Sequence, residues 1–222
     1  MLYIVPTPIG NLEDMTFRAI NVLKAAEVIL AEDTRKTKNL LEHYEITYDE
    51  LIAYHKFNEH KQLQKFVELA QAKNVALVTD AGTPGISDPG FLLIRECLKE
   101  HIQVLTLPGA TAFVPALVNS GLPCDKFYFE GFLPHKKGRQ KRLNYLKELD
   151  QTIVLYESPY RIVKTLEQLS EFFGQGRKAS VSREISKIYE ETIRGNLIEL
   201  IEHFKNKPPK GEFVIIIEGA NT

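Results

Sequence analysis

The residues with the clearest chemical potential form one glycine- and proline-rich loop, Thr79–Gly90, with the sequence TDAGTPGISDPG. It follows the apolar run Val75–Val78, which is typical of a buried parallel strand. Glycines and prolines disfavour regular helix and strand, and glycine lets a backbone approach a ligand closely. Open α/β sheets bind ligands at the carboxyl ends of their strands. The loop predicts a ligand-binding site rather than a plain turn, because it also carries Asp80, Thr83, Ser87 and Asp88.

A second chemically distinctive segment is basic. Residues His135–Arg142 include five Lys or Arg residues and no acid. The net charge of the whole chain is −1, so any site for a polyanion must be a local patch such as this one. The alternative interpretation of the segment is a solvated helix start.

The elements that position the loop follow an alternating pattern in the first half of the chain. Strand-like runs lie at residues 2–5, 28–31, 51–54, 75–78 and 102–105. Helical periodicity lies at residues 16–26, 34–44, 58–72, 91–101 and 112–120. This alternation predicts a mostly parallel sheet with helices on both faces.

The second half of the chain has a different order of predicted strands. Its strand-like runs are residues 127–130, 152–156, 179–183, 189–194 and 212–218. The runs 179–183 and 189–194 are too close in sequence for a parallel crossover, so we expect them to be antiparallel. The fold class is therefore predicted as two α/β domains, residues 1–113 with a mostly parallel sheet and residues 114–222 with a mixed sheet.

Composition narrows the class of protein. With 222 residues, 44% hydrophobic and 26% charged, the chain has the make-up of an ordinary globular protein. No apolar run approaches the roughly 20 residues of a membrane span, and the N-terminus lacks the features of a secretory signal. Cys97 and Cys124 form neither a disulfide framework nor a metal-ligand pattern, so we expect no metal and a cytoplasmic location. Walker A, G-x-G-x-x-G, H-E-x-x-H, C-x-x-C and G-x-S-x-G motifs are absent from the sequence.

Eight segments, in order along the chain, together resemble one family. They are Pro6–Asp14 with Thr16, Arg18 and Ala19; Ala31–Arg35; Thr79–Gly90; Leu107–Ala110; Gly131–Pro134; Tyr156–Arg161; Ser182–Glu184; and Lys210–Phe213. The family is the ribosomal RNA small subunit methyltransferase I family of the tetrapyrrole-methylase superfamily, whose members are class III methyltransferases.

The resemblance implies a two-domain protein that binds S-adenosylmethionine in a cleft between its domains. It implies 2′-O-methylation of a cytidine ribose in the decoding region of 16S ribosomal RNA. It also implies RNA binding, a cytoplasmic location and a homodimer. Many members carry a further small C-terminal domain beyond the position that matches Thr222.

The resemblance further implies which residues contact the cofactor. Gly82-Thr83-Pro84 matches the Gly-x-Pro loop of the superfamily, and the turn after residue 108 matches a second cofactor-lining turn. The implied set is Pro8, Asp80, Gly82, Thr83, Pro84, Ile86, Ser87, Thr111, Ala112, Tyr156, Gly211 and Glu212. For Pro8 and Tyr156 a purely structural role is the alternative.

Methyl transfer to a ribose favours a base or a cation near the hydroxyl, which is a weak nucleophile until its proton is removed. No catalytic lysine-aspartate-lysine-glutamate set can be assigned from spacing. The candidates are Asp33, Arg35, Glu157, Arg183, Glu184 and Lys187, with His55 and Glu59 as further possibilities. For each of them the alternative is an ion pair that fixes loop geometry.

The basic segment is the expected contact with RNA phosphates, which position a substrate without reading its sequence. The residues concerned are Lys136, Lys137, Arg139, Lys141 and Arg142. Tyr160 and Arg161 are expected to stack on a splayed base, the alternative being that Tyr160 packs in a helix.

Two other functions stay open from the sequence. One is a methylase of the same fold that acts on a small molecule such as a tetrapyrrole. The other is a cofactor-binding RNA or ribosome-assembly module without turnover. Residues 31–35 and 131–142 favour RNA over a tetrapyrrole.

Overall fold

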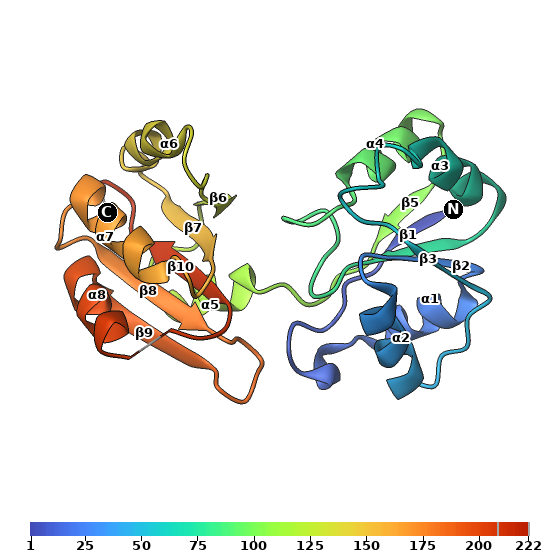
Figure 1. Cartoon of the computed structure of the whole chain (residues 1–222), viewed down its shortest axis with the longest axis horizontal. Coiled ribbons are helices and arrows are strands. Elements are labelled where there is room, and N and C mark those ends of the chain that lie inside the picture. The colour runs from blue at the N-terminus through green and yellow to red at the C-terminus, as the bar shows by residue number, and fades with distance from the viewer. Residues whose placement is uncertain (208, 222) are drawn as a thin grey trace. The chain divides into compact units, whose positions relative to one another are not determined.

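The computed structural model describes residues 1–207 and 209–221. They form two compact units, Met1–Thr111 and Ala112–Thr222, called here the first and second units (Figure 1). Within the described residues, no helix combines the length and the apolar character needed to cross a membrane.

The first unit contains a five-stranded sheet. Its strands are β1 (Leu2–Ile4), β2 (Val28–Ala31), β3 (Glu50–Ala53), β4 (Val75–Val78) and β5 (Val104–Thr106). Their order is β3-β2-β4-β1-β5, and every neighbouring pair is parallel. The predicted mostly parallel sheet is confirmed, and the carboxyl ends of all five strands therefore meet at one edge.

Helices cover both faces of this sheet, as predicted. They are α1 (Phe17–Ala25), α2 (Thr34–His43), α3 (Leu63–Ala72) and α4 (Phe91–Lys99), with a short 3-10 turn η1 (Leu12–Asp14). Successive strand residues point to opposite faces, so Leu77 packs with α3 and α4 while Ala76 and Val78 pack with α1 and α2 (Figure 1).

Helix α3 begins five residues later than the periodicity predicts. The side chain of Asn58 donates to the Ala53 carbonyl at 2.8 Å and accepts from the His55 N–H at 2.8 Å. These local bonds stabilise a turn in place of the first helical turn, which is a common effect of asparagine.

The second unit contains a mixed five-stranded sheet, and this prediction is also confirmed. Its strands are β6 (Phe127–Phe132), β7 (Thr152–Glu157), β8 (Lys178–Arg183), β9 (Glu191–Asn196) and β10 (Phe213–Ile217). The order is β6-β7-β10-β8-β9, in which β6 and β7 are parallel and the other pairs are antiparallel. The β8–β9 pair is the antiparallel pair expected from its short connection.

The helices of the second unit are α5 (Phe113–Ser120), α6 (Arg139–Leu146), α7 (Ile162–Phe173) and α8 (Leu197–Asn206). Residues of α6, α7 and α8 pack on one face of the sheet, and α5 packs on the other (Figure 1). The sequence pattern does not predict α7 or α8, and it offers α6 only as the helix start that is the alternative for the basic segment. Helix α6 lies in the crossover that the parallel β6–β7 pair requires.

Candidate functional site

The loop Thr79–Gly90 is fastened to the loop that follows β1. The backbone groups of Thr7 and Gly82 exchange two hydrogen bonds of 2.9 Å, and Thr7 Oγ1 donates to the Thr79 carbonyl at 3.0 Å. Gly82 has a φ of +85°, in the left-handed region that favours glycine. The loop is thus held in a specific shape at the carboxyl edge of the sheet.

The same loop is tied to the turn that follows β5. Thr83 Oγ1 donates to the Ala110 carbonyl at 3.1 Å. Gly109 lies so close to Pro6 that a Cβ on it would come within 2.6 Å of the Pro6 Cβ. Close backbone approach therefore explains the glycine of the second turn.

The predicted cofactor residues from Pro8 to Ala112 all follow β1, β4 or β5. Pro84 is buried, Pro8, Thr111 and Ala112 are half-buried, and Ile86 is 39% exposed. Ser87 is exposed and has a φ of +67°, an uncommon conformation for a residue with a side chain. Apolar and polar groups thus stand side by side on the loop, as ligand sites require.

Asp80 joins this loop to the start of α2. One carboxylate oxygen accepts from the Asp33 N–H at 3.0 Å, and the other accepts from Lys36 Nζ at 2.7 Å. Glu32 supports the arrangement, because Oε2 accepts from Thr79 Oγ1 at 2.7 Å and from the Asp80 N–H at 3.4 Å.

Lys36 and Glu32 are functional candidates that the sequence prediction misses. Glu32 lies within the Ala31–Arg35 segment, next to the candidate Asp33. Lys36 lies just beyond that segment, and only its contact across 44 residues with Asp80 singles it out. No sequence spacing carries this signal, since the contact depends on the pairing of β2 with β4.

Asp33 and Arg35 form a local pair at the N-terminus of α2. Asp33 is the N-cap and accepts from the Arg35 N–H at 2.9 Å, from Nε at 3.0 Å and from a terminal nitrogen at 2.7 Å. The hydrogen bond from the Arg35 side chain holds the pKa of Asp33 well below its usual range. The hydrogen bond that Lys36 donates to Asp80 raises the pKa of Lys36. Asp33 is therefore a weak base, and Lys36 is a cation at neutral pH.

His55 and Glu59 follow β3, the neighbour of β2 in the sheet. Within the part of the chain that the structure describes, His55 Nδ1 is buried without a hydrogen-bond partner. Glu59 accepts from the Tyr54 hydroxyl at 3.3 Å. The structure thus places both at the same sheet edge as Asp33.

In the second unit, Glu157 belongs to a buried network. It is 2% exposed and accepts from the Ser158 N–H, from Arg161 Nε and from Thr165 Oγ1, each at 2.7 Å. Arg161 also donates to the Leu133 carbonyl at 3.3 Å. These contacts favour the alternative role of Glu157, an ion pair that fixes loop geometry, and they engage Arg161, which was expected to stack on a base, in holding the chain after β7.

Arg139 extends this network, although it lies in the basic segment. It is 8% exposed and donates to Gln168 Oε1 at 2.7 Å, to the Pro134 carbonyl at 3.1 Å and to Thr165 Oγ1 at 2.7 Å. Burial lowers its pKa, yet a guanidinium stays charged in proteins. Arg139 therefore ties α6 to α7 instead of facing solvent.

The rest of the basic segment divides in two. Lys136, Lys137 and Lys141 are exposed. Arg142 is bound by Glu130, with Nε 2.7 Å from both carboxylate oxygens, and it also donates to the Tyr128 hydroxyl. Tyr160 is 95% exposed, so it does not pack inside a helix.

A third cluster lies at the β8–β9 hairpin. Lys187 Nζ donates to Glu184 at 2.9 Å and to Glu212 at 3.0 Å, and Glu184 also accepts from the Glu212 N–H at 3.0 Å. Burial alone would lower the pKa of Lys187, but these two carboxylates outweigh it and the pKa rises. Gly211 has a φ of +91°, in the left-handed region that favours glycine, and a Cβ on it would come within 2.3 Å of the Glu184 carboxyl carbon.

A hollow of about 330 Å³ adjoins this cluster and is lined by Arg183, Glu184, Tyr189 and Lys210. Arg183 donates to the Tyr189 carbonyl at 3.3 Å, and its Nε lies 3.4 Å from Glu191 Oε2. The candidate catalytic residues thus fall into separate groups, each within one unit. Among the described residues, no group of three or more His, Cys, Asp or Glu side chains is placed to hold a metal ion.

The architecture is that of the class III methyltransferases. Similar solved structures include diphthine synthase, with a TM-score of 0.77 and 13% identity over 98% of this chain and 89% of that chain. The methyltransferase CobJ has a TM-score of 0.71 and 19% identity over 99% of this chain and 94% of that chain. At such low identity these likenesses establish the fold alone.

Sequence comparison gives the family. The profile of the Tetrapyrrole (Corrin/Porphyrin) Methylases matches residues 1–201, and the chain belongs to this family. Relatives named Ribosomal RNA small subunit methyltransferase I include one from Synechocystis sp., 49% identical over 99% of this chain and 79% of that protein. The relative from Bacillus subtilis is 46% identical over 100% of this chain and 76% of that protein. The relative from Thermotoga maritima is 44% identical over 98% of this chain and 98% of that protein.

Proposed function

We propose that this protein transfers a methyl group from S-adenosylmethionine to the 2′-oxygen of a cytidine ribose in the decoding region of 16S ribosomal RNA. One observation carries the proposal. The relatives named as small-subunit ribosomal RNA methyltransferases are similar along nearly the whole chain, and the Thermotoga maritima relative is also covered over 98% of its own length. We place the reaction in the cytoplasm. The homodimer stays a prediction from the resemblance, and sedimentation velocity tests it.

The residues of the first unit suit the cofactor. Gly82-Thr83-Pro84 and the turn at Gly109 hold backbone close together, while Ile86 and Ser87 remain exposed beside them. An amphiphilic ligand needs both the apolar and the polar groups. When bound, the cofactor supplies a methyl group on a sulfonium for in-line displacement. Tyr156, Gly211 and Glu212 stay predictions that rest on the resemblance.

Positioning of the loop is the role we assign to Lys36. Its ammonium holds the Asp80 carboxylate at 2.7 Å, and Asp80 in turn accepts from the backbone of Asp33. Methyl transfer depends on orientation, since well-aligned reactants gain much of the rate from proximity. Because the pKa of Asp33 is lowered, we do not assign Asp33 as the general base.

RNA phosphates are contacted, in this proposal, by Lys136, Lys137 and Lys141, which are exposed. Arg139 is buried, and Arg142 is bound by Glu130. We therefore assign both arginines to stabilising the second unit and not to RNA contact. Arg183, Glu184 and Lys187 stay candidates for the reaction.

Transfer of labelled methyl from S-adenosylmethionine to small ribosomal subunits of an unmodified strain tests the proposal. Label at a ribose of the RNA is the expected result. Label only in small molecules favours the tetrapyrrole alternative, and RNA binding without transfer favours the assembly module. A Gly109→Ala variant is the matched negative control, because its Cβ meets Pro6 in the cofactor turn.

A further inference from the structure

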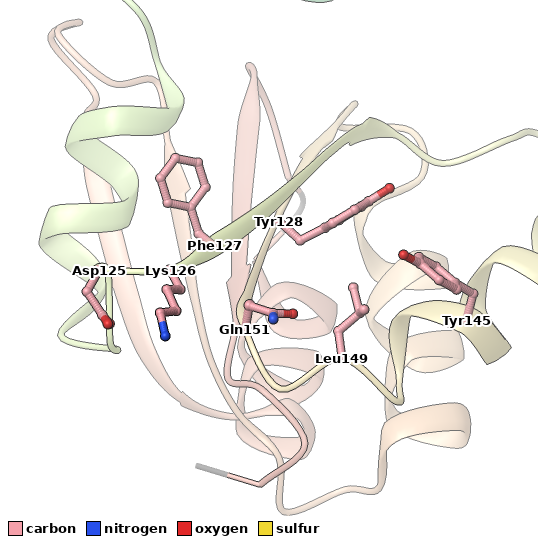
Figure 2. Close-up of a pocket in the computed structure, with 7 residues that line it drawn as sticks. All are labelled: Asp125, Lys126, Phe127, Tyr128, Tyr145, Leu149 and Gln151. Carbon is pink, nitrogen blue, oxygen red and sulfur yellow. The ribbon is translucent and has the colours of Figure 1, made fainter.

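A hollow of about 590 Å³ lies at the start of strand β6, and none of the residues that line it is assigned above to the cofactor. It is formed by residues 125–128, by Tyr145 of α6 and by Leu149 and Gln151 before β7 (Figure 2). Among the strands of the described residues, β6 pairs with β7 alone, so its other edge is free in the order of the sheet.

Two tyrosines form one wall of this hollow. The rings of Tyr128 and Tyr145 are 5.9 Å apart at 69°, and Figure 2 shows Tyr128 directed toward Tyr145 with Leu149 nearby. The Arg142 guanidinium carbon lies 5.4 Å and 4.9 Å from the two ring centroids. Glu130 binds the same guanidinium, so the wall is held in place before any ligand arrives.

The ring of Tyr145 in this wall is accessible to a binding partner. Tyr145 is 47% exposed, and Phe127, which lines the hollow outside this wall, is 42% exposed. Exposed aromatic rings beside a hollow are typical of binding surfaces, because their faces offer large contact area at low entropic cost.

The exposed charges of the segment that forms the hollow have a small cationic surplus. Within residues 125–151 they are four lysines and three acids, namely Lys126, Lys136, Lys137 and Lys141 against Asp125, Glu148 and Asp150. Lys126 lines the hollow, and Lys141 lies four residues before Tyr145 on α6, on the same helix face. Asp125 also lines it, but Figure 2 shows Asp125 on the far side of Lys126 from the tyrosines.

We propose that this hollow binds a single-stranded segment of the RNA substrate, with an unpaired base stacked on Tyr145 and phosphates contacted by Lys126 and Lys141. Stacking on aromatic side chains next to a cationic surface is how proteins hold single strands. The inference rests on the proposed function, since it names where the RNA of that reaction is held.

A tryptophan reporter tests the stacking directly. The chain contains no Trp, so Tyr145→Trp introduces a unique fluorophore. Titration with a ten-nucleotide single-stranded RNA of mixed sequence is expected to quench its fluorescence to saturation. An abasic oligomer of the same length is expected to leave most of the tryptophan fluorescence unquenched. The matched control is Leu98→Trp on α4, whose wild-type side chain is 57% exposed in the first unit and which should not respond.

Affinity gives a second readout that does not depend on the reporter. Tyr145→Ala should weaken binding of the same RNA about 5- to 100-fold, Tyr145→Phe should bind like wild type, and neither should change binding of the abasic oligomer. Far-UV circular dichroism checks that the variants fold.

Three outcomes overturn the inference. One is bound RNA without quenching at position 145, and another is unchanged affinity of Tyr145→Ala. The third is a Tyr145→Ala variant that alters sedimentation alone, which would make the hollow a contact between copies. If wild type methylates ribosomal subunits while Tyr145→Ala binds RNA normally, only this inference fails. If wild type neither binds RNA nor transfers methyl, the proposed function fails as well.

Discussion

The candidate sites of the two units are held together mainly by different kinds of contact. At the edge of the first sheet, glycines, prolines and threonines make most of the connections between backbone segments, as in the Thr7–Gly82 and Thr83–Ala110 contacts, and the Lys36–Asp80 pair adds one charged connection. In the second unit, charged side chains make the connections, as in the Glu157–Arg161 pair and the Lys187 cluster. A backbone-built site is vulnerable to added bulk, whereas a charge-built site is vulnerable to the loss of one partner.

The largest expected effect is on stability, at Glu157 in the second unit. Glu157→Ala leaves Arg161 without its carboxylate and Thr165 without an acceptor, so we expect a loss of about 3–5 kcal/mol in the free energy of unfolding. Urea denaturation followed by circular dichroism measures it. A loss below about 1 kcal/mol would contradict a network that depends on this charge.

Added bulk is the corresponding test of the first unit. Gly109→Ala places a Cβ 2.6 Å from Pro6, and we expect a loss of about 1–3 kcal/mol together with weaker binding of S-adenosylmethionine. Thermal unfolding and calorimetric titration measure the two effects. The matched control is Gly176→Ala, where a Cβ has no neighbour within 4 Å, and its stability should not fall.

Lys36 is expected to affect activity more than stability. Its side chain is 64% exposed, so solvent screens its pair with Asp80, yet Lys36→Met frees the carboxylate that ties the loop to α2. We expect kcat to fall about tenfold, which is about 1.4 kcal/mol in the barrier, with partial rescue in Lys36→Arg. Steady-state kinetics with ribosomal subunits separates kcat from KM. A rise in KM for RNA alone, with kcat unchanged, would instead make Lys36 a substrate contact.

RNA affinity should respond to the exposed lysines of α6 and its approach. Lys136→Gln with Lys137→Gln should lower the slope of log affinity against log salt by about 0.7 for each lysine, because each phosphate contact releases counterions. Fluorescence anisotropy across a salt series measures the slope. Lys164→Gln on α7 removes an exposed charge outside the basic segment, and an equal change in that variant would argue against a local phosphate site.

The smallest expected effect is a pH dependence at Glu184. Burial raises its pKa, but bonds from Lys187 and from the Glu212 N–H outweigh burial and hold the pKa below its usual range. A lowered folded pKa contributes stability above the unfolded value of about 4.3, and this contribution is lost as the pH falls through the folded value. Glu184→Gln should therefore reduce the stability lost between pH 7 and pH 3. Glu202→Gln, at an exposed position, should not.

Much of the fold was predictable because local chemistry decides it. The apolar runs predicted at residues 28–31 and 75–78 match β2 and β4 residue for residue. A strand buried on both faces is apolar at every position, so its first and last residues can be read from the sequence. The loop Thr79–Gly90 was predictable for a related reason, because its glycines and prolines exclude regular structure. Helix α3 was misplaced at its start, where Asn58 bonds to the backbone.

The basic segment shows where prediction from sequence stops. Arg139 and Lys137 stand two residues apart and carry the same charge, yet one is buried against Thr165 and the other is exposed. Their difference depends on which face of α6 meets α7, and charge counts do not contain that information.

By itself, the sequence determined the two types of sheet, the position of the candidate ligand loop and the family resemblance, because each depends on residues that are neighbours in the chain. Only the tertiary structure decided which charged groups meet. Lys36 reaches Asp80 because β2 pairs with β4, and Arg142 reaches Tyr128 and Glu130 because α6 packs back against β6. An ion pair or a ring stack forms only between groups a few ångströms apart, and folding alone sets that distance for residues far apart in sequence.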